Sequence, residues 1–466
     1  MGRRKVLLLN PPGDRLYARD KYCTSVSKTS YYWPQVDLLV QSGYLKDHHD
    51  IFVLDAIAER LSFEQSFARI KAMAADTVLF LTCSASWDTD FAFVKRLKDE
   101  LGMTTIANGG FLLFKGESAM EQFPHIDAVM LDFTEPDILD YLRGDVENLK
   151  GFIFRRDGAI VKRDREQHKR FSYPVPKHDL FPLKKYLFPL SKRGVYTAAL
   201  TSMGCPFKCT FCIPATLGFK LRDVDNVMEE LRYIRSLGVR EVLFQDSSFG
   251  ANRDHLRELC SKMIEARLGL AWICLSRVDI IDEERVKLMR RAGCHSIQFG
   301  VESGDERILQ TMSKGITLDQ TRRAFALCRE HKITTNGFFI IGMPGETEET
   351  VLKTIAFAKE LNCDVAAFSL PMPHPGTKLG EAVRSDGKML SEWDLFDDVS
   401  HPRVPTGYLS REKVWELRNR AYREFYFRPS YILRRAMRIT SRKELVMHIR
   451  AFLSIFRRVV LHDYEK

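Results

Sequence analysis

Short apolar runs alternate with amphipathic stretches along most of this 466-residue chain, in two separate series. Apolar runs of about four to eight residues are typical of buried strands, whereas apolar residues spaced every three or four positions are typical of helices. Strands that are separated by helices pair in parallel, and the helices then cover the sheet. The alternation therefore predicts an α/β protein built around two parallel sheets.

The first series spans residues 1–145 and predicts an open, doubly wound parallel sheet. Its predicted strands are 5–10, 50–55, 77–83, 104–107 and 128–131, and its predicted helices are 34–45, 63–74, 91–101 and 136–142. Ligands of such sheets bind beyond the carboxyl ends of the strands. Small or turn-forming residues follow three of these ends and leave room for a ligand to approach the backbone. They are Asn10, Pro11, Pro12 and Gly13, then Ser84, Ala85 and Ser86, then Asn108, Gly109 and Gly110.

Residues 146–194 interrupt the alternation. Asp157 and Gly158 stand between two short apolar runs, which is a strong signal for a tight hairpin. Prolines are frequent in the residues that follow, up to Pro189. We therefore predict a hairpin and a proline-rich linker between two domains.

The second series spans residues 195–380. Its predicted strands are 196–202, 241–245, 271–275, 296–301, 335–341 and 365–370, and its predicted helices are 224–237, 255–266, 283–292, 318–331 and 348–361. Six strand–helix units are too few to close the usual eight-stranded barrel. The series therefore predicts an open, partial barrel of six units.

Residues 381–466 predict a helical and strongly basic region. From residue 411 to the end, fifteen Lys and Arg stand against six Asp and Glu, whereas the rest of the chain is nearly neutral. Leu445, Ile449, Phe452, Leu453 and Phe456 recur at helical spacing with arginines between them. Two interpretations stay open: a helix packed on the barrel with its arginines in water, or peripheral contact with an anionic membrane surface. Because the basic residues are confined to one terminal region, we expect no nucleic-acid partner.

The compartment is predicted from the cysteines and the apolar runs. Ten cysteines in a long chain without a secretion pattern are typical of a reducing compartment, where thiols bind metals or pack as small apolar groups. No apolar run approaches the roughly 18 residues that a membrane span needs. We therefore expect a cytoplasmic protein, with the basic region as its only candidate for membrane contact.

Three cysteines, Cys205, Cys209 and Cys212, directly follow the first strand of the second series. Gly204 and Pro206 bend this segment, so three thiols within eight residues can turn toward one metal centre. Three thiolates are one short of a closed zinc site or a fully ligated four-iron cluster, which leaves one iron open. The alternative is a structural zinc loop with a distant fourth ligand.

The spacing of these cysteines, with an aromatic residue before the last, resembles the signature of the radical S-adenosylmethionine (SAM) enzymes. Later segments follow in the order of the branch that carries an N-terminal cobalamin-binding domain, which includes methylases and anaerobic cyclases. These segments are 244–249, 276–277, 292–294, 300–304, 341–346 and 373–377. The resemblance implies a [4Fe-4S] cluster on the three cysteines. It also implies that SAM is contacted by Phe211, Gln245, Asp246, Ser247, Ser276, Arg277, Glu302, Ile341 and Gly342.

The first series resembles the cobalamin-binding domain of the same branch. The resemblance implies that cobalamin lies along Asn10, Pro11, Ser84, Ala85, Ser86, Gly109 and Gly110. The Asp-x-His-x-x-Gly segment, which supplies the lower cobalt ligand in that domain, is missing here. The acidic Gly-Glu turn of the family is replaced by residues 132–136. The lower ligand is therefore open, and a structural sheet without cofactor is the alternative.

The resemblance implies a cobalamin-dependent enzyme that acts on an unactivated carbon. It forms a 5′-deoxyadenosyl radical and, as a C-methyltransferase, transfers the methyl group of methylcobalamin. An anaerobic cyclase or rearrangement enzyme is the second hypothesis, and a non-catalytic Fe–S or cobalamin carrier is the third. Methylthiolation is disfavoured, because the enzymes of the family that catalyse it carry three further cluster cysteines in the N-terminal domain. Here only Cys23 and Cys83 precede the cysteine loop. The implied partners are a small-molecule or lipid-like substrate, which His374 is a candidate to face, and an electron donor of the flavodoxin or ferredoxin type.

Overall fold

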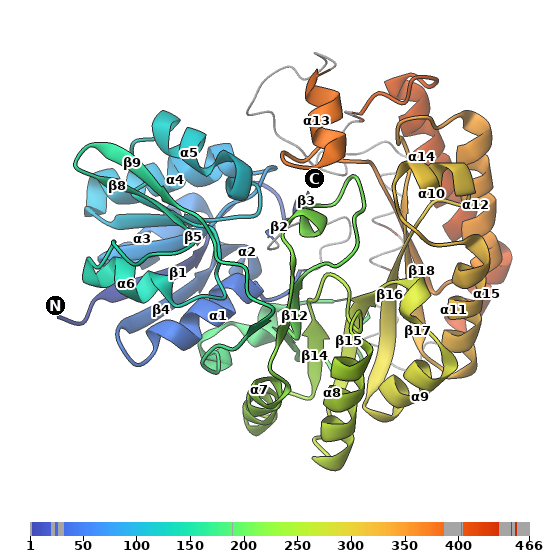
Figure 1. Ribbon diagram of the computed structural model, residues 1–466, viewed down its shortest axis with the longest axis horizontal. Helices are drawn as coiled ribbons and strands as arrows, with labels where there is room; N and C mark the ends of the chain where they lie inside the picture. The colour runs from blue at the N-terminus through green and yellow to red at the C-terminus, as the bar shows by residue number, and fades with distance from the viewer. Residues whose placement is uncertain are drawn as a thin grey trace.

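The computed structural model describes residues 2–19, 24–26, 32–188, 190–385, 402, 404–437, 449 and 453. Two α/β units lie side by side, one formed by the N-terminal part of the chain and one by the central part (Figure 1). The predicted α/β fold, with a doubly wound sheet followed by a partial barrel, is confirmed.

The N-terminal unit contains a seven-stranded sheet in the order β4-β1-β5-β6-β7-β8-β9. Five strands are parallel: β1 (Lys5–Asn10), β4 (Asp50–Asp55), β5 (Thr77–Leu81), β6 (Thr104–Asn108) and β7 (Ala128–Met130). Successive residues of β1 face opposite sides of the sheet, since Val6 and Leu8 pack in one apolar core and Leu7 and Leu9 in another. This burial on both faces explains why the strands read as continuous apolar runs.

Helices cover both faces of this sheet (Figure 1). They are α1 (Val36–Leu45), α2 (Ala56–Glu59), α3 (Phe63–Met73), α4 (Trp87–Leu101), α5 (Leu112–Gln122) and α6 (Asp137–Arg143). Helix α4 begins one turn earlier than predicted, and the sequence did not predict α5. The buried face of α5 includes Lys115 and Gly116. Its pattern is therefore not visibly amphipathic, because a long polar side chain and a glycine occupy positions that are usually apolar.

The predicted hairpin is present but belongs to the N-terminal sheet. Strands β8 (Phe152–Arg156) and β9 (Ala159–Arg163) pair around Asp157 and Gly158, which both have positive φ, as a tight two-residue hairpin requires. Strand β8 pairs with β7 in an antiparallel manner. The sheet thus runs past the predicted boundary at residue 145, because pairing across a crossover cannot be read from a local hairpin signal.

The central unit contains a six-stranded parallel sheet whose strand order follows the chain. Its strands are β11 (Thr197–Ala199), β14 (Glu241–Phe244), β15 (Ala271–Ser276), β16 (Cys294–Glu302), β17 (Thr334–Ile340) and β18 (Val365–Ser369). Its helices are α7 (Val224–Ser236), α8 (Arg253–Glu265), α9 (Glu283–Arg291), α10 (Glu306–Thr311), α11 (Leu318–Glu330) and α12 (Glu348–Leu361). Side-chain caps at Asn252, Asp282, Asp305, Thr317 and Thr347 begin five of them.

The predicted strand 196–202 is divided in two. Its first part is β11, whereas β12 (Ser202–Gly204) joins a separate three-stranded sheet with β10 (Arg170–Phe171) and β13 (Phe219–Arg222). The chain bends between them because the buried Asp246 carboxylate accepts hydrogen bonds from Thr201 and Ser202. Two further short strands, β2 (Tyr17–Arg19) and β3 (Thr24–Val26), form a hairpin after β1.

The C-terminal region begins with α13 (Lys378–Ser385), α14 (Arg411–Tyr426) and α15 (Pro429–Ala436). Helix α14 packs on the last barrel strand, where the Tyr422 hydroxyl lies 3.1 Å from both N and O of Phe368. Of the predicted amphipathic segment only Ile449 and Leu453 are described, and they are 48% and 46% exposed. The rest of it, and Cys23 and Pro189, lie outside the described residues. Within the described part of the chain, no helix is long and apolar enough to cross a membrane.

The proline-rich linker is packed against α1. A Cβ atom at Gly43 would lie 2.2 Å from the backbone oxygen of Pro174, so the two backbones are in direct contact. The Lys177 amide donates to the Ser42 hydroxyl at 2.8 Å, and the Lys46 ammonium donates to the Val175 carbonyl at 3.1 Å.

The carboxyl edges of the two sheets face each other. Lys220 on β13 forms ion pairs with Asp132 at 3.0 Å and Glu135 at 2.8 Å, both in the loop after β7. Gln245, directly after β14, donates to the Pro34 carbonyl at 3.1 Å. An apolar core continues from the α1 side of the N-terminal sheet to the first barrel strands. The loops that follow the strands of both units are therefore brought together.

Candidate functional site

The cysteine loop starts at a close contact between two glycines. Gly204 has a φ of +76°, and a Cβ atom there would lie 1.9 Å from the Gly218 carbonyl oxygen. The same oxygen accepts a hydrogen bond from the Cys205 amide at 3.0 Å. Only glycine fits this position, since any side chain would collide with the backbone of the next segment.

The three predicted cluster ligands differ from the other described cysteines in exposure. Cys205, Cys209 and Cys212 are partly exposed, whereas the remaining six described cysteines are buried and behave as core residues. The loop is fixed at the barrel mouth, because the Thr210 amide donates to the Met312 carbonyl and the Thr210 carbonyl accepts from the Leu379 amide, both at 3.0 Å. Phe211 packs in the apolar cluster beneath it.

Positive charge lies beside the thiols. The Arg277 guanidinium lies 3.8 Å from the Cys209 sulfur, stacks on the Phe207 ring at 3.7 Å and is held by Asp279 at 2.9 Å. Burial raises the pKa of the Cys205 thiol, and the Arg277 charge opposes this effect. A nearby cation stabilises thiolates, the form that binds iron. Among the described residues no three His, Cys, Asp or Glu side chains are grouped as a single ion requires. Cluster ligation by these three cysteines stays a prediction.

A buried ion pair lies at the end of β16. The Lys314 ammonium lies 2.6 Å from the Glu302 carboxylate, and both residues are less than 10% exposed. Glu302 has a φ of +66°, and the register shifts between Gly300 and Glu302, so a bulge turns this side chain. The sequence analysis missed Lys314, which no predicted motif contains. Its backbone carbonyl accepts from Arg277 at 2.7 Å, which links the predicted SAM residues Arg277 and Glu302.

Other predicted SAM residues shape the backbone around the loop. The Asp246 carboxylate accepts from the Thr201 amide at 2.8 Å and the Ser202 hydroxyl at 2.7 Å, and the Ser276 hydroxyl donates to the Phe249 carbonyl at 2.8 Å. Asp246 and Ser276 are buried, while Ser247 beside them is partly exposed. Direct contact of these residues with SAM stays a prediction.

The turn after β17 is built around a buried acid. Ile341 is buried, and Gly342 has a φ of +107°. The Glu346 carboxylate accepts hydrogen bonds from the amides of Gly342 at 2.5 Å and Met343 at 3.0 Å. Burial raises the pKa of Glu346 to about 7, against the lowering effect of these two amides. Glu346 thus fixes the backbone of the predicted adenine-side turn and is about half protonated at neutral pH.

Arg19, which the sequence analysis did not single out, lies at the centre of the carboxyl edge of the N-terminal sheet. Arg19 is 2% exposed and donates to the Asn10 side chain at 2.8 Å, the Pro11 carbonyl at 2.9 Å and the Ser86 hydroxyl at 3.2 Å. It also forms an ion pair with Asp90 at 2.6 Å. Three predicted cobalamin residues are therefore gathered around one buried cation.

The remaining predicted cobalamin residues lie on the same edge. Ser84 and Ala85 are buried. Gly109, which precedes Gly110, packs directly on the backbone of Thr82. A Cβ atom at Gly109 would lie 2.3 Å from the Thr82 carbonyl oxygen, so a larger residue does not fit there. The loops after β1, β4, β5, β6 and β7 contain no histidine. Cobalamin contact by these residues stays a prediction.

His374 lies in the loop after β18 and is partly exposed. Its carbonyl accepts a hydrogen bond from the Thr377 hydroxyl at 2.7 Å. Two residues later, Gly376 meets α5, since a Cβ atom there would lie 2.0 Å from the Phe114 ring. This loop is therefore at the contact between the two units, and a role toward substrate stays a prediction.

Comparison with known proteins identifies the family. Residues 200–358 match the model of the radical SAM superfamily. The chain is 30% identical over 446 residues to an uncharacterized methyltransferase of Pyrococcus horikoshii, which covers 92% of this chain and 94% of that protein. The chain belongs to the radical SAM superfamily. It is therefore an enzyme. It is also 24% identical to the anaerobic magnesium-protoporphyrin IX monomethyl ester cyclase of Rubrivivax gelatinosus, over 94% of this chain and 82% of that one.

Solved structures agree in fold. The radical SAM methyltransferase TsrM from Kitasatospora setae, with cobalamin and a [4Fe-4S] cluster bound, matches with a TM-score of 0.63 at 21% identity, over 83% of this chain and 78% of that one. The cobalamin-dependent radical enzyme OxsB, with aqua-cobalamin and SAM bound, matches with a TM-score of 0.68 at 15% identity, over 97% of this chain and 72% of that one. Both domains are thus arranged as in these two enzymes.

Replacing the buried acid at the Gly342 turn should change the pH dependence of stability. The raised pKa means that the Glu346 carboxyl holds its proton more tightly in the folded protein than in the unfolded chain. The stability that the protonated carboxyl contributes is therefore lost as pH rises from about 4.5 to about 7. Glu346→Gln stays neutral and can still accept from both amides. We expect the variant to be more stable than the wild type at pH 8, by up to about 3 kcal/mol, with the two proteins converging near pH 4.5. Urea unfolding across this range measures it.

Glu349→Gln is the matched control, because this exposed side chain lies on the surface of α12. It should leave the pH profile unchanged. Parallel profiles for the wild type and Glu346→Gln would show that Glu346 is ionised at neutral pH.

Proposed function

We propose that this chain is a cobalamin-dependent radical SAM enzyme that methylates an unactivated carbon. The observation that carries the proposal is the apposition of two carboxyl edges, one with the cysteine loop and one with the small-residue loops around Arg19. Contacts of Lys220 with Asp132 and of Gln245 with Pro34 hold these edges together. Radical generation and methyl donation on one substrate require two cofactors that face the same space.

In this proposal Cys205, Cys209 and Cys212 hold a [4Fe-4S] cluster whose open iron binds SAM. When bound, the pair supplies the 5′-deoxyadenosyl radical that abstracts hydrogen from carbon. The chain's own residues bind and orient SAM. Arg277 is suited to an anionic carboxylate, and the Glu302 carboxylate to an ammonium or ribose hydroxyl. The ion pair with Lys314 keeps the Glu302 carboxylate at the mouth of the barrel.

Cobalamin would lie along Asn10, Pro11, Ser84, Ala85, Ser86, Gly109 and Gly110. When bound, it supplies the methyl group that the substrate accepts. The Arg19 network fixes the loops after β1 and β5, so the edge would be preorganised for a large planar ligand. Since the loops on this edge contain no histidine, no imidazole from them is available as the lower cobalt ligand. TsrM and OxsB bind cobalamin on the same architecture, which supports the assignment.

A radical cyclase is the second candidate. Similarity to the cyclase of Rubrivivax gelatinosus over most of both chains favours it, and the barrel motifs do not specify the fate of the substrate radical. A methylase consumes SAM as methyl donor and adds about 14 mass units to its substrate, whereas a cyclase does not. A non-catalytic carrier is disfavoured, because a carrier has no use for the buried Glu302–Lys314 pair beside the cysteine loop.

The proposed partners are a small-molecule or lipid-like substrate and an electron donor of the flavodoxin or ferredoxin type. A tryptophan substrate is bound in one structure of TsrM, which supports the small-molecule class. An apolar, basic surface supports membrane contact. On α15 and just after it, Ile432, Leu433 and Met437 are 45%, 62% and 71% exposed, in a region where Lys and Arg exceed acidic residues. We propose a cytoplasmic enzyme that contacts anionic lipid at the periphery through this surface.

The cluster assignment predicts that each loop cysteine is essential. After anaerobic reconstitution, Cys205→Ala, Cys209→Ala and Cys212→Ala should each lose four-iron absorption and abolish SAM cleavage to 5′-deoxyadenosine, because a cluster needs all three thiolates. Chromatography of the reaction products measures the cleavage. Cys260→Ala, in the buried face of α8, is the matched control and should keep both properties. Cleavage at the wild-type rate by any of the three loop variants contradicts the assignment.

The cobalamin assignment predicts retention of one cobalamin per chain after gel filtration. The absorption spectrum should be that of the base-off form, since the loops on this edge offer no imidazole to the cobalt. Cys205→Ala should retain cobalamin equally well, because the two sites lie on different units. If the wild type elutes without cobalamin, the methylation route fails and the superfamily assignment stands alone.

The membrane proposal predicts salt-dependent binding to anionic vesicles. The wild type should sediment with phosphatidylserine vesicles at low salt and be released at about 1 M salt, where the Debye length falls to about 3 Å. Leu433→Asp combined with Met437→Asp should reduce sedimentation, whereas Leu237→Asp at the end of α7 should not. Equal sedimentation of all three proteins, or none with the wild type at low salt, would remove α15 as a lipid-binding surface.

A further inference from the structure

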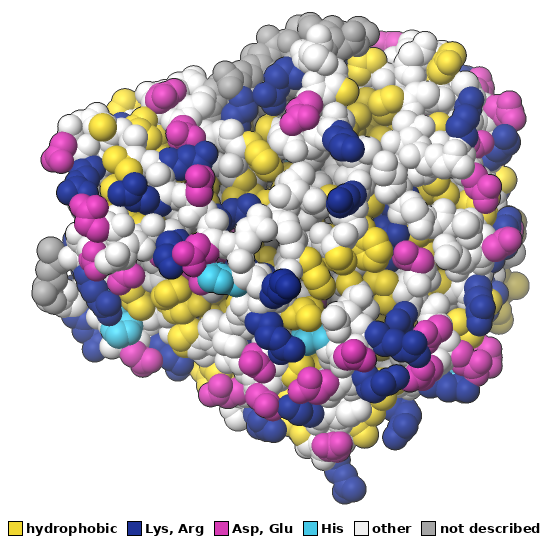
Figure 2. Space-filling model, viewed as in Figure 1, with side chains coloured by type: hydrophobic (Ala, Val, Ile, Leu, Met, Phe, Trp, Pro, Cys, Tyr) yellow, Lys and Arg dark blue, Asp and Glu magenta, His cyan; other side chains and the backbone are white. Residues whose placement is uncertain are grey.

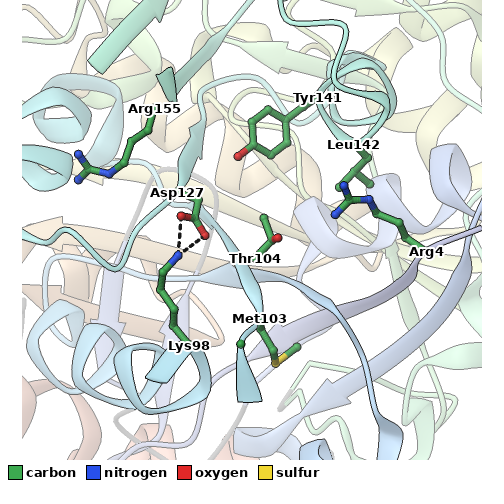
Figure 3. Close-up of a pocket in the computed structure, with 9 residues that line it drawn as sticks. Arg4, Lys98, Met103, Thr104, Asp127, Tyr141, Leu142 and Arg155 are labelled. Carbon is green, nitrogen blue, oxygen red and sulfur yellow. Dashed lines mark hydrogen bonds and ion pairs between the residues drawn. The ribbon is translucent and has the colours of Figure 1, made fainter. Parts of the chain in front are cut away.

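A hollow of about 520 Å³, drawn in Figure 3, lies at the amino edge of the N-terminal sheet. The Arg19 network lies at the opposite end of the same strands. Arg4 precedes β1, Thr104 begins β6 and Asp127 precedes β7, so three strand starts form the floor of the hollow. Tyr141 of α6 and Lys98 of α4 stand at its sides. None of these residues belongs to the proposed cluster, SAM or cobalamin sites.

The charges in the hollow do not cancel. Lys98 and Asp127 neutralise one another, with the ammonium 2.5 and 2.6 Å from the two carboxylate oxygens. Arg155 donates to the carbonyls of Ile126 and Met120, and among the described residues it forms no ion pair. Arg4 is half-buried, and within the described chain its guanidinium makes no hydrogen bond or ion pair. The residues that line the hollow therefore include two more basic than acidic side chains.

Its unused donors line the same hollow. Figure 3 shows the Tyr141 hydroxyl on the side of Asp127 and the Arg4 guanidinium on the side of Leu142, with Thr104 between them. The Tyr141 ring is fixed by stacking on Phe152 at 5.5 Å. Burial raises the pKa of Tyr141 to about 12, so its hydroxyl keeps its proton and can donate. A fixed phenol, a free guanidinium and a threonine hydroxyl together suit an acceptor with several oxygens.

We propose that this hollow binds a phosphomonoester, with its phosphate held by Arg4, Tyr141 and Thr104. A phosphomonoester carries close to two negative charges at neutral pH and offers three acceptor oxygens, which matches the excess charge and the three donors. A carboxylate has one charge and two oxygens, so it matches less well. The volume also accommodates a sugar attached to the phosphate. The hollow contains no nucleophile or free acid–base pair, so its role is binding.

The test is calorimetric titration of the reconstituted wild-type enzyme with ribose 5-phosphate, inorganic phosphate and acetate at constant ionic strength. We expect binding of ribose 5-phosphate. Arg4→Gln should weaken it about tenfold or more, and Tyr141→Phe about threefold to tenfold, as expected for the loss of a charged and a neutral hydrogen bond. Arg3→Gln is the matched control, because Arg3 is an exposed neighbour that pairs with Asp50. It should leave the affinity unchanged.

The ligands distinguish the source of the phosphate. Tighter binding of ribose 5-phosphate than of inorganic phosphate supports a phosphorylated metabolite, and equal binding supports recognition of phosphate alone. Absence of binding, an affinity insensitive to Arg4→Gln, or acetate binding as tightly as phosphate would overturn the proposal. Circular dichroism and four-iron absorption of each variant show that the fold and the proposed cluster site are intact, so this outcome is independent of the proposed function.

Discussion

The candidate site depends on the hydrogen bonds that the buried Asp246 carboxylate accepts. A buried carboxylate is costly unless donors surround it, and here the amide and hydroxyl of Thr201 and the hydroxyl of Ser202 provide them. These bonds end β11 after three residues and turn the chain into β12. The cysteine loop consequently leaves from a small separate sheet at the barrel mouth. Without this bend the first barrel strand would continue, and the thiols would lie elsewhere.

Much of the fold could be predicted because it depends on local patterns. Strands β1 and β4 have the predicted bounds, and all six predicted barrel strands are present, one of them divided. The failures involve distant partners. The role of Arg19 depends on its contact with Asp90, which lies 71 positions away in the sequence. The role of Lys220 depends on its contact with Asp132, which lies 88 positions away. No window of sequence contains both members of such a pair, so the centre of the proposed cobalamin edge was missed.

The candidate site shows a similar division. The cysteines could be recognised from spacing, and the structure shows them more exposed than the other described cysteines. In the structure, the motif residues Asp246, Ser276 and Gly109 contact the backbone of neighbouring segments. Lys314 was missed because its relation to Glu302 depends on a bulge at the end of β16. A motif records which residues are needed, but it does not separate those that touch a ligand from those that position its neighbours.

Charge is distributed differently on the surface and at the buried contacts. Lys and Arg are interspersed with Asp and Glu over the face shown in Figure 2. Exposed pairs of this kind contribute little to stability. Buried pairs among the described residues include Arg19 with Asp90 at the N-terminal edge, Lys220 with Asp132 between the units, Lys314 with Glu302 at the barrel mouth and Arg222 with Glu230. Removing one partner of such a pair leaves an uncompensated charge, which makes these junctions sensitive to substitution.

The contact of Gly43 with Pro174 has a consequence for motion. The segment that joins the two units is attached to α1 through backbone contact and through the bonds of Ser42 and Lys46. At these described residues the connector is not a free hinge, so opening the units here would require breaking these bonds and exposing the shared apolar core. We therefore expect molecules to enter and leave through rearrangement of surface loops and side chains rather than through separation of the two sheets.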